Sequence, residues 1–156
     1  MRVDSLAREE LLGRIADFHG HLGPYVIMGF RAGCAARRLL GTRGYFDLEA
    51  VVQSGDRPPI SCFADGVQLG SGCTTGKGNL KVASGAGDGA GVQARAAAVF
   101  TTRPADGEPA RRVVVRVLSS AEEQASRWMR DLGEREAAER VLDLDERSLF
   151  EIVAEP

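Results

Sequence analysis

Hydrophobic and polar positions along the chain follow two periods, which predict helices near both ends and strands between them. In residues 4–18, Leu11, Ile15 and Phe18 recur at helical spacing and predict an amphipathic helix. Residues 25–40 are apolar nearly all round at first and end in basic residues before a glycine, which predicts a buried central helix.

The rest of the chain shows shorter patterns. Runs of β-branched and aromatic residues predict strands, and an apolar segment after a Pro-Pro pair predicts a short helix. The expected strands are residues 46–53, 80–83, 91–101 and 112–118, and the expected helices are residues 60–69 and 121–139, the latter capped by Ser120 with Glu123 and broken at Gly133. Residues 149–154 could be a final strand or a tail. N-terminal helices, then strands, then C-terminal helices predict an α+β fold with a mostly antiparallel sheet packed with helices.

Two glycines, Gly29 and Gly33, lie four residues apart in the predicted central helix. Glycine lowers helix propensity, so its presence there needs a reason. The simplest reason is packing, because glycine permits another backbone to approach closely.

The composition limits the class of protein. A length of 156 residues with 44% hydrophobic content suits one domain, so residues 1–156 are predicted to form a single unit. The 20 Lys and Arg residues nearly balance the 22 Asp and Glu residues, which disfavours nucleic acid or an anionic membrane as a partner. No apolar run approaches the roughly 20 residues of a membrane helix, and the first residues lack the pattern of a signal peptide. We therefore expect a cytoplasmic protein.

The chain has three cysteines and two histidines. Three cysteines are too few for a disulfide framework, so in a cytosolic chain they are candidates for packing, metal ligation or nucleophilic chemistry. The histidines, His19 and His21, are two residues apart in a glycine-containing break. An extended backbone there would point both imidazoles at one ion. A pair of hydrogen-bonding loop histidines is the alternative reading.

The cysteines differ in their surroundings. Cys62 falls in the first turn of the short predicted helix, where free N–H groups and the helix dipole favour a thiolate. Asp65 follows on the same helical face and could be a ligand, a partner that orients a ligand, a proton acceptor or an ordinary surface carboxylate. Cys73 lies among glycines and threonines, which argues against a buried filler. Cys34 lies in the apolar helix and is assigned to packing.

The loop GSGCTTGKGN, residues 70–79, looks like a phosphate-binding P-loop but fails the spacing test. Ser71 stands where the motif needs a glycine, and Gly78 stands where it needs Ser or Thr. A weaker anion site remains open, in which backbone N–H groups act with Lys77 and Asn79. The alternative is a glycine-rich turn whose lysine is solvated.

Two stretches, FHGHLGPYVIMGFRAG and SCFADGVQLGSGCTTGKGN, together with their separation, resemble the FmdE-like family, which is named after a component of formylmethanofuran dehydrogenase. The resemblance covers residues 15–100. It implies an α+β core domain, commonly a homodimer, in which the HGH segment and the two later cysteines converge on a cleft that can hold a metal, usually zinc. The positions that it supports as metal ligands are His19, His21, Cys62 and Cys73, with Asp65 close by.

This sequence departs from the family pattern in two ways. Many members resemble HGHxCPG at the first motif, whereas here Gly23 stands in place of the cysteine and Tyr25 in place of the glycine. Longer members also carry a C-terminal zinc-finger module, and no cysteine follows Cys73 here. The missing thiolate favours an open metal site over a closed one.

Two kinds of function fit such a site. An open site would suit a metal-dependent enzyme or a binder of an unknown small molecule, linked to one-carbon or redox metabolism, with Asp65 orienting a histidine or moving a proton and the glycine loop forming one wall. A closed His₂Cys₂ site would suit a structural role, a metal carrier, or an accessory component of a formylmethanofuran dehydrogenase-like oxidoreductase. A metal-free thiol enzyme using Cys62 ranks last. Zinc is the default ion, although mixed nitrogen and sulfur ligands also suit iron, nickel or copper.

Overall fold

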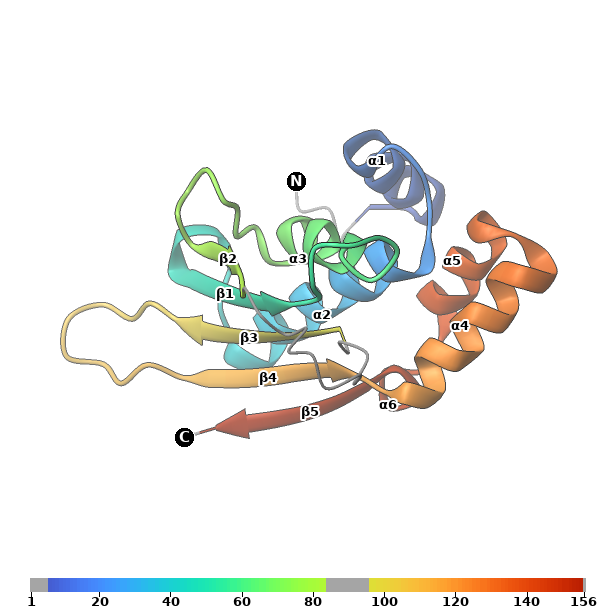
Figure 1. The fold of residues 1–156 in the computed structure, drawn as a ribbon. Helices are drawn as coiled ribbons and strands as arrows, with labels where there is room; N and C mark the ends of the chain where they lie inside the picture. The colour runs from blue at the N-terminus through green and yellow to red at the C-terminus, as the bar shows by residue number, and fades with distance from the viewer. Residues whose placement is uncertain (1–5, 84–95, 156) are drawn as a thin grey trace.

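A computed structural model describes residues 6–83 and 96–155. Figure 1 shows helices α1, α4 and α5 gathered at one end of the molecule and the hairpin that joins β3 to β4 projecting at the other. The elements in chain order are α1 (Arg8–His19), α2 (Pro24–Leu40), the 3-10 turn η2 (Tyr45–Asp47), β1 (Leu48–Gln53), α3 (Cys62–Ser71), β2 (Leu80–Val82), β3 (Ala97–Thr102), β4 (Arg112–Val117), α4 (Ser119–Leu132), α5 (Glu134–Asp143), α6 (Glu146–Leu149) and β5 (Phe150–Glu155).

The described strands form a five-stranded mixed sheet in the order β2-β1-β3-β4-β5. Only β1 and β2 pair in parallel, and the other neighbours are antiparallel. This confirms an α+β fold with a mostly antiparallel sheet. The parallel pair requires a crossover, which α3 supplies between β1 and β2. Residues 150–155 form an edge strand, which decides between the two alternatives for that segment.

One face of the sheet is buried under α2 and α3, which pack on β1, β3 and β4. Side chains alternate across a strand, so every second residue of these strands reaches this core. The fully buried residues on this face are Leu48, Ala50, Val52, Ala98, Phe100, Val113, Val115 and Val117. Cys34 packs half-buried against the same core, which confirms its assignment to packing.

Helices α2 and α3 pack backbone to backbone through glycines on both helices. A Cβ atom at Gly29 would lie 2.0 Å from the carbonyl oxygen of Phe63, and a Cβ atom at Gly66 would lie 2.0 Å from that of Val26. The close approach predicted for this face of α2 is therefore confirmed. Gly33 meets the far end of α3, at Gly70, so the two helices run in the same direction. Their N-terminal ends consequently lie side by side.

Three details of the helix ends differ from the sequence prediction. Phe18 is 51% exposed, and Leu12 takes the buried place on α1 instead. Residues 4 and 5 lie outside the described residues, and α1 begins at Arg8. The capping box at Ser120 is wrong, because α4 already begins at Ser119 and no side chain caps it. The break at Gly133 is confirmed, since α4 ends and α5 begins there.

None of the described helices combines the length and the apolar character that a membrane crossing requires.

Candidate functional site

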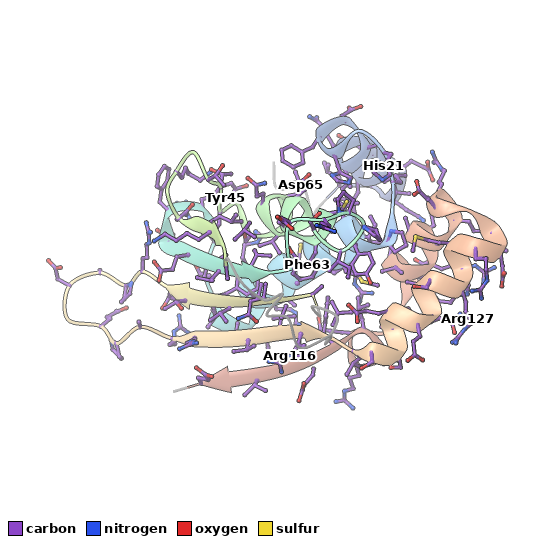
Figure 2. All side chains as sticks on the ribbon, in the orientation of Figure 1. His21, Tyr45, Phe63, Asp65, Arg116 and Arg127 are labelled. Carbon is purple, nitrogen blue, oxygen red and sulfur yellow. The ribbon has the colours of Figure 1, made fainter. Side chains whose placement is uncertain are left out.

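The two histidines and the first turns of α3 meet where α1 ends. His19 is the last residue of α1, and the chain then turns at Gly20, whose φ of 96° is a left-handed conformation that suits glycine. The rings of His19 and His21 lie with centroids 4.7 Å apart. Figure 2 shows His21 and Asp65 on the α1 side of the molecule, on different elements. The predicted proximity of the two imidazoles is therefore present in the fold.

Asp65 fixes the orientation of His19. Its Oδ2 atom lies 2.7 Å from Nδ1 of His19, across 46 positions of sequence. An ionised carboxylate can only accept, so for a neutral imidazole we assign the hydrogen to Nδ1 and the lone pair to Nε2. The His19 side chain is only 8% exposed, and within residues 6–83 and 96–155 its buried Nε2 atom has no hydrogen-bond partner. The described residues thus hold the ring in one orientation and leave Nε2 without a donor to pair with.

His21 lies on the more open side of the group. Its side chain is half exposed, and its Nε2 atom is 3.9 Å from Oε2 of Glu134, the first residue of α5. Gly23 lies beside the same ring. A Cβ atom at Gly23 would be 3.5 Å from Nε2 of His21, and among the described residues its other neighbour within 4 Å would be a second atom of that ring. The family pattern has a cysteine at this position, and the Cβ atom of such a cysteine would lie next to the ring of His21.

Cys62 lies one helical turn before Asp65 and is partly buried. Burial raises the pKa of its thiol above the ordinary value, and the negative charges of Asp65 and Glu134 raise the pKa further. This direction runs against the sequence prediction that a position in the first turn favours a thiolate. Burial and two acidic neighbours act against ionisation of the thiol here.

Cys73 lies at the opposite end of α3. The eight residues from Asp65 to Cys73 correspond to about 12 Å along a helix. Cys73 is fully buried in the core, and its thiol donates a hydrogen bond of 3.4 Å to the carbonyl oxygen of Leu48. The expectation that Cys73 is not a buried filler is wrong, because its polar sequence neighbours belong to a loop that packs its thiol against β1. The structure does not bring Cys73 to the histidines.

The glycine loop is held by its own side chains at this same far end of α3. Asn79 is buried, and its amide donates to the carbonyl oxygens of Tyr45 and Leu48 and accepts from the N–H of Thr74. Lys77 donates to Oγ1 of Thr74 and lies over a phenyl ring, that of Phe46. Asn79 has no donor left for an anion, and the loop does not form a wall of the histidine site.

No group of three or more His, Cys, Asp or Glu side chains in residues 6–83 and 96–155 is arranged to hold a metal ion. The four predicted ligands are thus not assembled into one closed set. The fold does bring together His19, His21 and Asp65, with Cys62 one turn away.

Sequence reasoning missed Glu134. It lies 113 positions after His21, in a helix rich in charged residues, and nothing in its local pattern distinguishes it from its neighbours. Glu134 also lines a cleft of about 660 Å³ between the start of α1 and α5, together with Arg8, Glu139 and Asp143. Only the packing of α5 beside the end of α1 reveals its position.

A comparison with known protein families shows which family the chain belongs to. A family model described as "FmdE, Molybdenum formylmethanofuran dehydrogenase operon" matches residues 18–153. The chain belongs to the FmdE family. The FmdE match runs from the residue before His19 into β5, so it includes the histidines, α3 and most of the sheet.

One relative carries a name that states what it binds. A protein of Archaeoglobus fulgidus named as a probable S-adenosyl-L-methionine-binding protein is 36% identical over 76 residues. The match covers 45% of this FmdE chain and 19% of the archaeal protein. The chain therefore spans about a fifth of that relative.

Proposed function

We propose that this FmdE-family chain binds one transition metal ion, with zinc as the default, through His19 and His21, and that the ion keeps open positions for a small-molecule ligand. The observation that supports this is the Nε2 atom of His19, which is buried and has no hydrogen-bond partner. Asp65 holds the ring so that this nitrogen keeps its lone pair. A carboxylate behind a histidine is the usual arrangement around a histidine that ligates a metal.

A purely structural role for His19 accounts for the geometry less well. Leaving a buried nitrogen without a partner costs about 1–3 kcal/mol, and a histidine used only for packing would normally satisfy both nitrogens. Here one nitrogen is tied to Asp65 at 2.7 Å while the other is left free. A bound ion removes this cost.

The surroundings fit a borderline metal such as zinc. Two imidazoles lie together, and Cys62 is one helical turn before Asp65, the residue that holds His19. The described residues do not form a ready three-ligand group, so the Cys62 side chain has to turn toward the histidines on binding. Cys62 is the proposed third ligand, and it must lose its proton on binding because its pKa is raised in the metal-free protein. Cys73 has no part in the proposal.

Zinc in such a site supplies Lewis acidity, which polarises a ligand or lowers the pKa of bound water. The chain supplies the orientation. Asp65 accepts the Nδ1 hydrogen of His19, which fixes the tautomer and makes the other nitrogen a stronger donor. Gly23 leaves space beside His21 where the family pattern has a cysteine. This combination suits an enzyme or a small-molecule binder better than a closed structural site.

The main alternative is an accessory role, as a metal carrier or a protein that acts beside molybdenum formylmethanofuran dehydrogenase, which the family name suggests. A closed His₂Cys₂ site would favour it, and the described residues do not form one. A thiol enzyme that uses Cys62 is disfavoured because the pKa of that thiol is raised and its thiolate fraction is therefore low.

The archaeal relative suggests one ligand to test. Its name gives S-adenosyl-L-methionine as its ligand, but the matched segment is 19% of that protein. S-Adenosyl-L-methionine is therefore a probe for the open positions, to be titrated into metal-loaded and metal-free protein.

The decisive experiment is metal analysis of the purified protein and of single variants. We expect about one metal ion per wild-type chain, and a large loss in His19→Leu and Cys62→Ser, since each removes a ligand. Asp65→Asn keeps both imidazoles, so we expect it to bind about 10- to 100-fold more weakly.

Cys73→Ser is the matched control, because it makes the same chemical change at the other end of α3. Its metal content should equal that of the wild type. Equal metal content in wild type and His19→Leu would overturn the proposal. Loss only in the His19 variant, with full content in Cys62→Ser, would remove Cys62 from the ligand set.

A further inference from the structure

The cleft between α1 and α5 adjoins the proposed metal site at one of its ends. It follows α5 from Glu134 to Asp143, a stretch of about 13 Å along the helix axis. At the first end, Oε2 of Glu134 lies 3.9 Å from Nε2 of His21, and the charge of Glu134 is among those that raise the pKa of the Cys62 thiol. Glu134 therefore lines the cleft and is also close to two of the proposed metal ligands.

The cleft has the size and the character of a site for a small polar molecule. Its volume is about 660 Å³, which is within the range of roughly 300–1,000 Å³ that ligand pockets have. Leu132, which is 40% exposed, and Gly133 contribute the uncharged part of the described wall, and the rest of it is charged. A ligand that fits here has polar groups to meet these charges and a short hydrocarbon part to cover Leu132.

Most of the charges in the wall already neutralise one another. Each of its three arginines forms an ion pair with a carboxylate of the same wall, namely Arg8 with Asp143, Arg135 with Glu139 and Arg140 with Glu136. Glu134 is the remaining carboxylate, and among the described residues the ionisable group paired with it is that of His21. The wall therefore carries one negative charge that no arginine balances, at the end that adjoins the metal site.

A bound metal ion does not remove this charge. A histidine must be neutral to ligate a metal, so His21 cannot balance Glu134 in the loaded site. The two positive charges of a divalent ion are matched by the thiolate of Cys62, its proposed ligand, and by the carboxylate of Asp65, which holds His19. The charge of Glu134 is left over. A cleft with an unbalanced negative charge attracts ligands that carry a positive group.

We propose that the cleft between α1 and α5 holds the small-molecule ligand of the metal site, and that Glu134 selects a ligand with an alkylammonium group. A donor atom at one end of this ligand takes an open position of the ion, the ammonium group lies against Glu134, and the remainder follows α5. The inference rests on the proposed function, because it needs an ion bound at His19 and His21. The alternative is that Glu134, which is 64% exposed, is an ordinary solvated carboxylate.

Three imidazoles that differ only in their tails test this selection. They are N-aminopropylimidazole, which carries a cationic tail, N-hydroxypropylimidazole, which is neutral, and N-carboxyethylimidazole, which carries an anionic tail. Each is titrated into the cobalt-loaded protein, whose visible absorption changes when an imidazole nitrogen binds the ion. We expect the dissociation constant of the cationic ligand to be about three- to fivefold lower than that of the neutral one, because an ion pair with a partly exposed carboxylate has a modest effect. The anionic ligand should bind most weakly.

Two variants decide whether Glu134 causes the preference. Glu134→Gln should bind the cationic and neutral ligands about equally while keeping the cobalt content of the wild type. Glu136→Gln makes the same chemical change in the same wall, but at a carboxylate already paired with Arg140, so it should keep the preference. In the zinc-loaded protein, the amide NMR signals of α5 should shift with the cationic ligand, and those of the β3–β4 hairpin should not.

Failure of this inference and failure of the proposed function give different results. A protein that takes up no cobalt, or whose cobalt spectrum responds to none of the three ligands, would overturn the proposed function and this inference with it. A cobalt site that binds all three ligands with equal affinity would overturn the inference alone. A preference that survives in Glu134→Gln, or α5 signals that do not shift, would also overturn it, since another group or another surface would then hold the cation.

Discussion

The two ends of helix α3 carry similar residue types but differ in how their polar atoms are satisfied. At the C-terminal end, the thiol of Cys73 donates to Leu48, and Asn79 uses its oxygen and both amide hydrogens. At the N-terminal end, His19 is held by Asp65 and leaves a buried nitrogen without a partner. Buried polar groups nearly always have a hydrogen-bond partner, so one without a partner requires an explanation.

The difference separates two roles that the sequence alone does not distinguish. A buried polar residue whose hydrogen bonds are complete stabilises the fold and has nothing left for a ligand. A buried polar residue with one hydrogen-bonded atom and one polar atom without a partner lowers the stability of the fold, and a ligand that binds the second atom restores that stability. By this criterion the C-terminal end of α3 is structural, and the N-terminal end is the candidate site.

The largest expected effect concerns the close backbone contact between α2 and α3, on which the positions of both ends of α3 depend. Gly66→Ala would place a Cβ atom 2.0 Å from the carbonyl oxygen of Val26. The two helices cannot move away from each other to relieve this overlap without disrupting the hydrophobic core. We expect a loss of about 3 kcal/mol or more in the free energy of unfolding, measured by urea denaturation.

Gly13→Ala is the control for this change, because no atom of the part of the chain that the structure describes lies within 4 Å of a Cβ atom at that position of α1. Alanine is the better helix former, so this variant should gain about 0.5–1 kcal/mol. A Gly66→Ala protein as stable as the wild type would show that the two helices are not packed as closely as described.

The second prediction compares the two ends directly. Asn79→Ala removes hydrogen bonds to buried backbone groups, so we expect it to cost about 3 kcal/mol. Metal content should be unchanged. His19→Leu removes a buried nitrogen that has no partner, so we expect the stability of the metal-free protein to stay within about 1 kcal/mol of the wild type. Urea denaturation of chelator-treated samples measures both, and the opposite ranking would contradict the comparison.

The smallest expected effect concerns the open side of the site. Glu134 is 64% exposed and lies 3.9 Å from His21, so solvent screens the pair. We expect Glu134→Gln to change metal affinity only about twofold, measured by competition with a chromophoric chelator. Glu136→Gln, on the same helix, is the control and should change nothing. A loss as large as that of His19→Leu would make Glu134 a ligand instead of a neighbour.

Much of the fold was predictable because it follows from local patterns. The central helix, the break at Gly133 and strand β4 fall close to their predicted positions. Hydrophobic periodicity and turn residues are local signals, because they depend only on a few neighbouring residues. The parallel pairing of β1 with β2 was not predicted. Strand direction depends on how the chain returns after α3, which no local pattern records.

The candidate site divides in the same way. The sequence by itself singled out His19, His21, Cys62 and Asp65 as candidates, because residue chemistry and spacing can be read from it. It also marked the glycines of α2 as a packing surface. It could not separate Cys62 from Cys73.

Tertiary structure decided which of these atoms meet. The packing of α1 on α3 sets Asp65 against His19, and the position of α5 beside the end of α1 leaves Glu134 beside His21. The loop after α3 buries Cys73 against β1. The physical reason is distance along the chain. Spacing fixes the relation of residues within one element, whereas a binding site is built from atoms on different elements, whose separation is set only when the core packs.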